Sequence, residues 1–324
     1  MKNVNSRSLT KTAETTWFSR KFKAAKTELF RNYQLFLLIL LPIAYMIIFH
    51  YIPMYGAQIA FRHFRAVDGI WGSPWVGFEY FVRFFNTHMF SRIIRNTLTI
   101  SIYSLAAGFP IPIILALSLN NATSKRFRKI VQTTTYAPYF ISVVVMVGIL
   151  MQFLSPKIGI VNKVIETLGG TPKMFMAEPT MFSSVYVWSG IWQGAGWGTI
   201  IYLAALAGVD VSLHEAAVVD GASRLRRIWH IDIPGILPTM VIILILNAGQ
   251  LMNVGFEKVI LMQNAMNLQT SEIISTYVYK IGLASNLPNY SYGAAIGLFN
   301  SVINFFLILV VNQIAKKATE TSLW

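Results

Sequence analysis

Six long apolar segments, none of which contains Asp, Glu, Lys or Arg, most constrain what this chain can fold into. They lie at residues 34–51, 96–119, 130–154, 181–205, 238–256 and 293–315. A helix of about 20 apolar residues crosses the hydrocarbon core of a bilayer. The chain as a whole is 55% hydrophobic and 12% charged, with a mean hydropathy of +0.54. We therefore predict an all-α integral membrane protein with six transmembrane helices.

The basic residues are distributed unevenly between the segments that connect these apolar runs. Seventeen of the 27 Lys and Arg residues lie in one alternating set of segments, residues 1–31, 120–129, 207–237 and 316–324. The other set holds the remaining ten and comprises residues 53–95, 155–180 and 257–292. Because Lys and Arg are retained on the cytoplasmic side of a membrane, we expect both termini and the 207–237 segment to be cytoplasmic.

This pattern predicts three parts: a basic cytoplasmic segment at residues 1–31, a transmembrane domain at residues 32–315 and a cytoplasmic tail at residues 316–324. The net charge of +14 lies mainly beside apolar runs, where Lys and Arg set topology and attract anionic lipid. We therefore do not expect nucleic-acid binding. The first apolar run is too long for a signal peptide, so we expect it to remain as an anchored span.

The residue types that the sequence lacks exclude several kinds of chemistry. Cysteine is absent, which excludes disulfides, thiolate metal sites and cysteine nucleophiles. The five histidines are scattered and do not form a catalytic or metal-binding group with carboxylates, so we predict no catalytic residue and no metal site. The apolar runs also lack the carboxylates on which ion-coupled carriers depend. A membrane-embedded enzyme and an ion-coupled secondary sugar carrier are therefore kept only as alternatives.

The segment at residues 212–238 is the most polar long stretch in the second half of the chain. Ser212 and Glu215 have the spacing of a capping box, which predicts a helix starting at Leu213. Gly221 would let the chain leave that helix with a positive φ. A second short helix over residues 222–229 is then expected to stop before the prolines at 234 and 238. The prediction is two short helices bent at a glycine.

The same segment resembles the EAA loop of permease subunits of binding-protein-dependent ABC importers of the maltose type. It reads E-A-A-V-V-D-G-A, followed by I-D-I-P-G-I-L-P. The matching positions are Glu215, Ala216, Ala217, Asp220, Gly221, Ala222, Ile231, Pro234 and Pro238. One position departs from the family pattern, because Ile228 stands where the family commonly has a large aromatic residue.

The resemblance implies a type I ABC importer permease fold, in which this loop is a cytoplasmic coupling helix that docks on an ATPase. It also implies a second permease subunit forming a heterodimer, two ATPase subunits and an extracytoplasmic solute-binding protein. The sequence has no G-x-x-x-x-G-K-[ST] motif, so ATP and Mg would bind the partner ATPase and no cofactor would bind this chain. The implied location is the bacterial cytoplasmic (inner) membrane, and the chain would not itself be an enzyme.

A second stretch of sequence restricts the resemblance to one branch of this family. Residues 51–64 read Y-I-P-M-Y-G-A-Q-I-A-F-R-H-F and are similar to the stretch after the first span in one branch of sugar permeases. Residues 127–162 and 187–206 fit the same branch. That branch imports oligosaccharides from complex polysaccharides such as pectin, xylan or alginate. The basic excess of the outer segments would suit an acidic oligosaccharide or a binding protein, or be incidental.

Side chains that suit a sugar lie within or beside the apolar runs. The expected substrate pathway consists of Tyr186, Trp188, Trp192, Gln193, Asn247, Gln250 and Asn253. The last three recur every three residues, which would place them on one helix face. That face could line the pathway, or its amides could bond neighbouring helices together. For Gly190, Gly194 and Gly198 we expect close helix packing.

Overall fold

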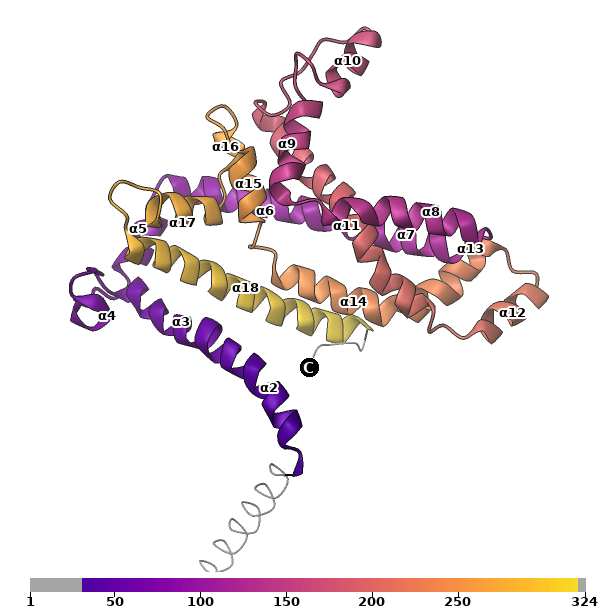
Figure 1. Cartoon of the computed structure of the whole chain (residues 1–324), viewed down its shortest axis with the longest axis horizontal. Coiled ribbons are helices and arrows are strands. Elements are labelled where there is room, and N and C mark those ends of the chain that lie inside the picture. The colour runs from indigo at the N-terminus through magenta and orange to yellow at the C-terminus, as the bar shows by residue number, and fades with distance from the viewer. Residues whose placement is uncertain (1–30, 320–324) are drawn as a thin grey trace, which may run out of the picture. The chain divides into compact units, whose positions relative to one another are not determined.

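The computed structural model describes residues 31–319, and this part of the chain folds into helices connected by loops, with no β-strand (Figure 1). The chain divides into two compact units, Met1–Gln58 and Ile59–Trp324. The predicted basic segment at residues 1–31 lies, apart from Arg31, outside the described residues. The all-helical prediction is confirmed for the described part.

The first unit is one apolar helix whose hydrogen-bonding pattern changes along its length. It consists of α2 (Tyr33–Met46), the π-helix η1 (Ile47–Tyr51), α3 (Ile52–Met54) and the start of the 3₁₀ helix η2 (Tyr55–Phe61). The run Tyr33–Phe61 is long and apolar enough to cross a membrane and contains the predicted segment 34–51.

The second unit holds the remaining helices. Its first half contains α4 (Gly69–Gly72), α5 (Glu79–Phe85), α6 (Met89–Gly108), α7 (Pro110–Asn120), α8 (Lys125–Tyr136), η3 (Ala137–Phe140), α9 (Val143–Phe153), α10 (Ile160–Thr167) and η4 (Pro179–Met181). Its second half contains α11 (Phe182–Leu206), α12 (Val211–Val219), α13 (Arg224–Arg227), η5 (Ile228–Asp232), α14 (Ile233–Gly249), α15 (Phe256–Met262), α16 (Leu268–Ser271), α17 (Ile274–Gly282) and α18 (Tyr290–Thr319).

Three runs of this unit could each cross a membrane as one helix: Met89–Asn120, Arg224–Gly249 and Tyr290–Lys317. Two further pairs are bent. Lys125–Phe140 meets Val143–Phe153 at 104°, and Pro179–Leu206 meets Val211–Val219 at 76°. The described residues therefore hold four candidate spans, or up to six if each bent pair is one span. Six transmembrane helices remain a prediction.

The predicted span at residues 130–154 is not one continuous helix, because the chain turns sharply between α8 and α9. Pro138 lies in the 3₁₀ helix η3, where its missing N–H removes a bond of a regular α-helix. Ser142 then caps the new helix, since its side chain accepts a hydrogen bond from the Val145 N–H. A proline followed by an N-cap restarts the helix in another direction.

The predicted helix stop before Pro234 and Pro238 is also wrong, as is the span limit of 238–256. The helix runs without a break from Arg224 to Gly249. A π-turn, η5, lies directly before Pro234, and the Ile233 N–H donates to the Ile228 carbonyl five residues back. The wider turn relieves the contact that a proline ring makes with the carbonyl four residues earlier. The first unit repeats this arrangement, with η1 before Pro53.

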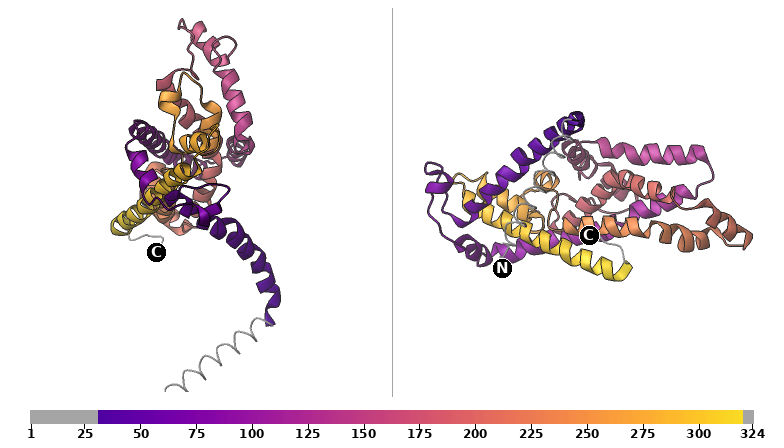
Figure 2. Two further views of the ribbon diagram at one scale, coloured as in Figure 1. Left: turned by 90° about the vertical axis from the view of Figure 1, so that its left-hand side faces the viewer. Right: turned by 90° about the horizontal axis from the view of Figure 1, so that it is seen from below.

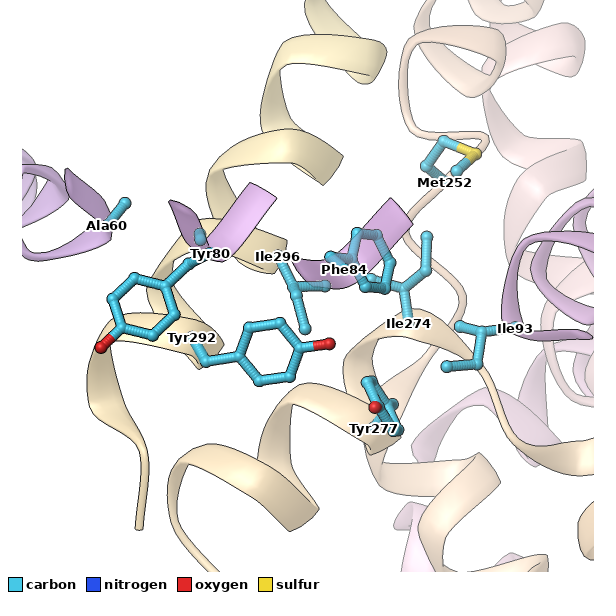
Figure 3. Packing of buried hydrophobic residues seen from close by; sticks show 10 residues of the cluster. Ala60, Tyr80, Phe84, Ile93, Met252, Ile274, Tyr277, Tyr292 and Ile296 are labelled. Carbon is cyan, nitrogen blue, oxygen red and sulfur yellow. The ribbon is translucent and has the colours of Figure 1, made fainter. Parts of the chain in front are cut away.

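A buried aromatic and aliphatic cluster joins α5, α6, α17 and α18 (Figure 3). Phe84 from α5 and Ile296 from α18 are fully buried at its centre, and Tyr277 and Tyr292 border them. An ion-pair group lies beside this cluster, where the buried Glu272 carboxylate, between α16 and α17, bonds both Arg92 on α6 and Lys280 on α17. This end of the unit is therefore held by apolar packing and by a paired buried charge.

The helix α11 is the central element of the second unit, since it packs against α6, α7, α8 and α14. The helices α14 and α18 also lie against each other along their lengths (Figure 1; Figure 2). Gly196 permits the contact between α11 and α8, because a side-chain carbon there would clash with the Thr135 carbonyl. The prediction of close helix packing at Gly194 is wrong, because a side-chain carbon added there would meet nothing within 4 Å.

We expect Gly196→Ala to destabilise the protein by about 1–3 kcal/mol, because the added methyl group has no free space against the α8 backbone. Thermal unfolding of the purified protein in detergent measures the effect. Gly194→Ala is the matched control on the same helix and should leave the midpoint unchanged. Equal midpoints for the two variants would contradict the assignment of Gly196 as the packing contact.

Candidate functional site

The helix α12 carries most of the segment that resembles the EAA loop. It begins at Val211, two residues earlier than expected, and Asp210 caps it by accepting a hydrogen bond of 2.9 Å from the Ser212 N–H. The predicted capping box of Ser212 and Glu215 is therefore wrong, since an acidic side chain just before it takes the cap position. The bond from the Ser212 backbone, with one from its side chain, lowers the pKa of Asp210 below its ordinary value.

The end of α12 confirms the role expected for Gly221. Its φ is +74°, which only glycine adopts without strain. The Gly221 N–H donates to the Val218 carbonyl and the Ala222 N–H to the Ala217 carbonyl, at 3.0 and 2.8 Å. This pair of bonds is a Schellman motif, which satisfies carbonyls that the helix end would otherwise leave free. Ala217, Gly221 and Ala222 thus form the end of the helix.

The remaining EAA-like side chains lie on an exposed helix surface. Glu215 and Ala216 on α12 and Asp220 at its end are exposed, and so is Pro234 in the first turn of α14. Large apolar side chains surround them and are likewise exposed: Val211, Leu213, Val218, Val219, Leu225 and Trp229. A short helix with an uncovered apolar face and one carboxylate is suited to docking on another protein.

A buried polar contact ties α12 to the rest of the unit. The Asp232 side chain in η5 is fully buried, and its Oδ1 lies 3.3 Å from His214 Nε2 on α12. Its Oδ2 accepts a hydrogen bond of 3.1 Å from Asn121 at the end of α7. We call Asn121, His214 and Asp232 the α12 tether. The sequence analysis did not predict this contact, and the one feature that could have indicated it is an acidic residue, Asp232, beside an apolar run.

Four of the predicted pathway residues meet at one cavity of about 450 Å³. It is lined by Tyr186, Asn247, Gln250 and Asn253, together with residues of α6 and α7. The expectation of a single helix face is wrong, because α14 ends at Gly249 and Asn253 lies in an irregular loop. The turn after α14 nevertheless leaves all three amide side chains lining the same cavity.

These amides also bond to one another and to α18, as expected for amides that hold neighbouring helices together. Asn253 Nδ2 donates to Gln250 Oε1 at 2.7 Å, and Asn300 Nδ2 donates to Asn253 Oδ1 at 2.9 Å. Asn304 Oδ1 accepts the Met252 N–H at 3.0 Å. The amides therefore bond helices together while their side chains line a cavity.

A second cavity, of about 340 Å³, lies beside the first, since Ser104, Gly108, Pro112 and Tyr186 line both. Gln193 lines this second cavity, and its Nε2 donates to the Ile141 carbonyl at the break between α8 and α9. The wall also includes Gly190 and Gly194 on α11. At Gly194 the small residue leaves open space, in agreement with the lack of any packing contact there.

Lys258 on α15 also lines the second cavity, although its sequence position placed it in an outer loop. Its side chain is buried, with 8% exposed. The Nζ donates to the Tyr186 carbonyl at 2.8 Å and lies 4.7 Å from the centre of the Tyr186 ring. Sequence reasoning missed this residue because nothing local distinguishes it from a solvated loop lysine.

Trp188 and Trp192 lie elsewhere. They line a third, strongly apolar cavity of about 630 Å³ between α9 and α11. Trp188 Nε1 donates to the Tyr103 hydroxyl at 2.8 Å. The structure thus separates these two tryptophans from the amide-lined cavities. In residues 31–319 no cluster of His, Asp or Glu is arranged to hold a metal ion.

Comparison with known proteins gives matches over most of the chain. The family described as binding-protein-dependent transport system inner membrane component matches residues 108–320. Protein LplB of Bacillus subtilis is 42% identical, over 91% of this chain and 92% of its own length. The polygalacturonan/rhamnogalacturonan transport system permease protein YteP of Bacillus subtilis is 40% identical, over 94% of each chain.

Two solved structures are similar throughout the fold. One is a bacterial ABC transporter involved in the import of the acidic polysaccharide alginate; it has a TM-score of 0.83 and 39% identity, covering 90% of this chain and 98% of that chain. The other is a bacterial alginate ABC transporter in complex with a periplasmic protein that holds an alginate pentasaccharide. It has a TM-score of 0.84 and 38% identity, covering 92% and 99%.

We expect Asp232→Ala to loosen α12, because His214 and Asn121 lose their shared partner. The amides of α12 should lose about 1–3 kcal/mol of protection, the range for breaking a buried hydrogen-bonded group. Hydrogen exchange of the purified protein measures this, with the exposed Glu166→Ala on α10 as control. Unchanged exchange in α12 would show that the tether does not hold the helix.

Proposed function

The chain belongs to the family of binding-protein-dependent transport system inner membrane components, and from this premise we propose that it is the permease subunit of an ATP-driven oligosaccharide importer. It is a transport subunit and not an enzyme. The substrate we propose is a fragment of a complex polysaccharide such as pectin, xylan or alginate. Support comes from the names of the relatives, which concern polygalacturonan, rhamnogalacturonan and alginate.

The observation that carries this proposal is the form of α12. The helix is capped by Asp210, ends in the Schellman motif at Gly221 and presents exposed Glu215 and apolar side chains. In the proposed importer, α12 is the coupling helix that docks on a separate ATPase subunit. ATP and Mg would bind that ATPase, since the sequence lacks a phosphate-binding loop.

The two amide-lined cavities are the proposed path for the sugar. Sugar hydroxyls need hydrogen-bond partners, and the wall offers the Asn247 and Gln250 amides and the Tyr186 hydroxyl. Asn247, Gln250 and Asn253 are exposed in this chain taken alone, which suits a cavity completed by a second permease subunit. The proposed assembly is therefore a heterodimer of permeases with two ATPases and an extracytoplasmic solute-binding protein.

Transport in this assembly follows from two linked equilibria. A sugar-loaded binding protein outside and ATP inside each favour one arrangement of the permease pair, so each ligand changes the affinity for the other. The helix from Arg224 to Gly249 connects the α12 tether at Asp232 with the cavity at Gln250. We propose that movement of α12 reaches the cavity through this continuous helix.

We expect Glu215→Lys to abolish ATP-driven uptake while leaving membrane insertion intact, because the reversed charge faces the proposed ATPase groove. The measurement is sugar-stimulated ATP hydrolysis and uptake by the complete complex in liposomes. Glu166→Lys makes the same charge change on the exposed α10 and should transport normally. Normal uptake by Glu215→Lys at wild-type expression would refute the proposed coupling role.

A second variant tests the pathway. Gln250→Ala removes an amide that lines the cavity and bonds Asn253, so we expect the half-saturating sugar concentration to rise about fivefold to tenfold, the cost of one or two hydrogen bonds. Gln152→Ala on the exposed side of α9 is the matched control. An unchanged concentration dependence would remove Gln250 from the pathway.

A further inference from the structure

Lys258 is a buried cation for which the described residues provide no carboxylate. The ion pairs in residues 31–319 are Arg65 with Asp68, Arg92 with Glu272, His214 with Asp232 and Lys280 with Glu272. Lys258 is the one Lys or Arg of the described residues whose side chain is buried, whereas the half-buried Arg92 and Lys280 both have Glu272 as a partner. A buried ammonium without one is costly, because the protein replaces its hydration shell only in part.

The contacts of Lys258 leave part of the ammonium free. An ammonium has three N–H donors. One donates to the Tyr186 carbonyl at 2.8 Å, and the face of the Tyr186 ring lies 4.7 Å from Nζ. On the facing helix stands Gly190, where an added side-chain carbon would come within 3.3 Å of Nζ. The glycine therefore keeps the approach to the ammonium open.

The cavity around Lys258 has the composition of a sugar site with a single charge. Lys258 is the one charged side chain among the described residues that line the two adjacent cavities. The other polar groups near it are neutral, and they include Gln193, Ser104 and the Tyr186 hydroxyl. That hydroxyl accepts the Gly255 N–H at 3.2 Å, so its own proton remains available to a ligand.

We propose that Lys258 is a specificity-determining residue that binds the carboxylate of a uronic-acid unit as an acidic oligosaccharide passes through the cavity. This rests on the proposed function, because it assigns a substrate class to the proposed pathway. A carboxylate would supply the partner that the ammonium lacks, in a charge-assisted hydrogen bond. Neutral sugars would leave the ammonium unpaired.

The electrostatics of the site agree with this assignment. The α15 helix lies outside the continuous apolar spans, and burial lowers the pKa of the Lys258 ammonium from its ordinary value. A bound carboxylate acts in the opposite direction and favours the protonated form. The neighbouring Glu257 is exposed and is not paired with Lys258 in the described structure, so the ammonium stays available for a ligand.

The test compares acidic and neutral forms of one sugar. Galacturonate and mannuronate trimers, each with its carboxyl-reduced uncharged counterpart, are titrated against the purified complex of permeases and ATPases without the binding protein. Lys258→Met removes the charge and keeps the apolar stem, while Lys157→Met does the same at an exposed lysine. Basal ATP hydrolysis of each complex reports its integrity.

We expect the wild-type complex and Lys157→Met to bind at least one acidic trimer about tenfold or more tightly than its neutral counterpart. Lys258→Met should lose this preference while it binds the neutral trimer as before. An unchanged preference in Lys258→Met would overturn the proposal. So would equal loss of both trimers, which indicates a structural role, and so would a wild-type complex that shows no preference or binds neither trimer.

Failure of the proposed function is measured separately. Uptake by the wild-type complex, with binding protein and ATP in liposomes, tests whether the chain imports oligosaccharides at all. Uptake together with an unchanged preference in Lys258→Met removes only the role of Lys258. An absence of uptake for every acidic and neutral trimer removes the proposed function, and the Lys258 proposal with it.

Discussion

The loop at residues 250–255 is the feature on which the cavities of this protein depend. The chain leaves α14 at Gly249 and starts α15 at Phe256, so its backbone needs hydrogen-bond partners from elsewhere. Asn304 on α18 accepts the Met252 N–H, and the Tyr186 hydroxyl on α11 accepts the Gly255 N–H. Irregular backbone in a membrane protein is tolerated only where such partners exist. Two side chains from distant helices thus hold the loop that shapes the cavity and orients α15.

A small group of polar contacts also fixes the opposite end of α14. There the π-turn accommodates Pro234 and brings Asp232 into the buried α12 tether with His214 and Asn121. Between these ends, the helix is continuous and apolar, with Ile236 and Ile245 fully buried. A rigid element with polar contacts at each end is suited to carry a displacement between two sites. In the proposed importer these sites are the ATPase contact and the sugar pathway.

Much of the architecture could be predicted from hydrophobic periodicity, composition and spacing. All six apolar segments without charges correspond to helices for most of their length, and the motif of Glu215, Gly221 and Ala222 identified the family. The wrong predictions occur where a rule based on local sequence was overridden by a contact with another residue or by a local change in helix geometry. Asp210 displaced Ser212 as the cap of α12. A π-turn let a helix continue through a proline that was expected to stop it. Gly196 rather than Gly194 permits close packing, because α8 approaches only one face of α11.

Sequence by itself determined that this chain is helical, which segments are apolar enough to cross a membrane and which family it belongs to. These properties follow from side-chain hydropathy and from residues close together in the chain. Only the tertiary structure decided which polar residues share a cavity. Lys258 and Tyr186 are 72 positions apart, and Asn300 and Asn253 are 47 apart, so no local pattern pairs them. The burial of Lys258 also depends on tertiary structure. Its sequence position suggests a solvated loop lysine, but the contact between α15 and Tyr186 of α11 makes it a buried cation without an acidic partner.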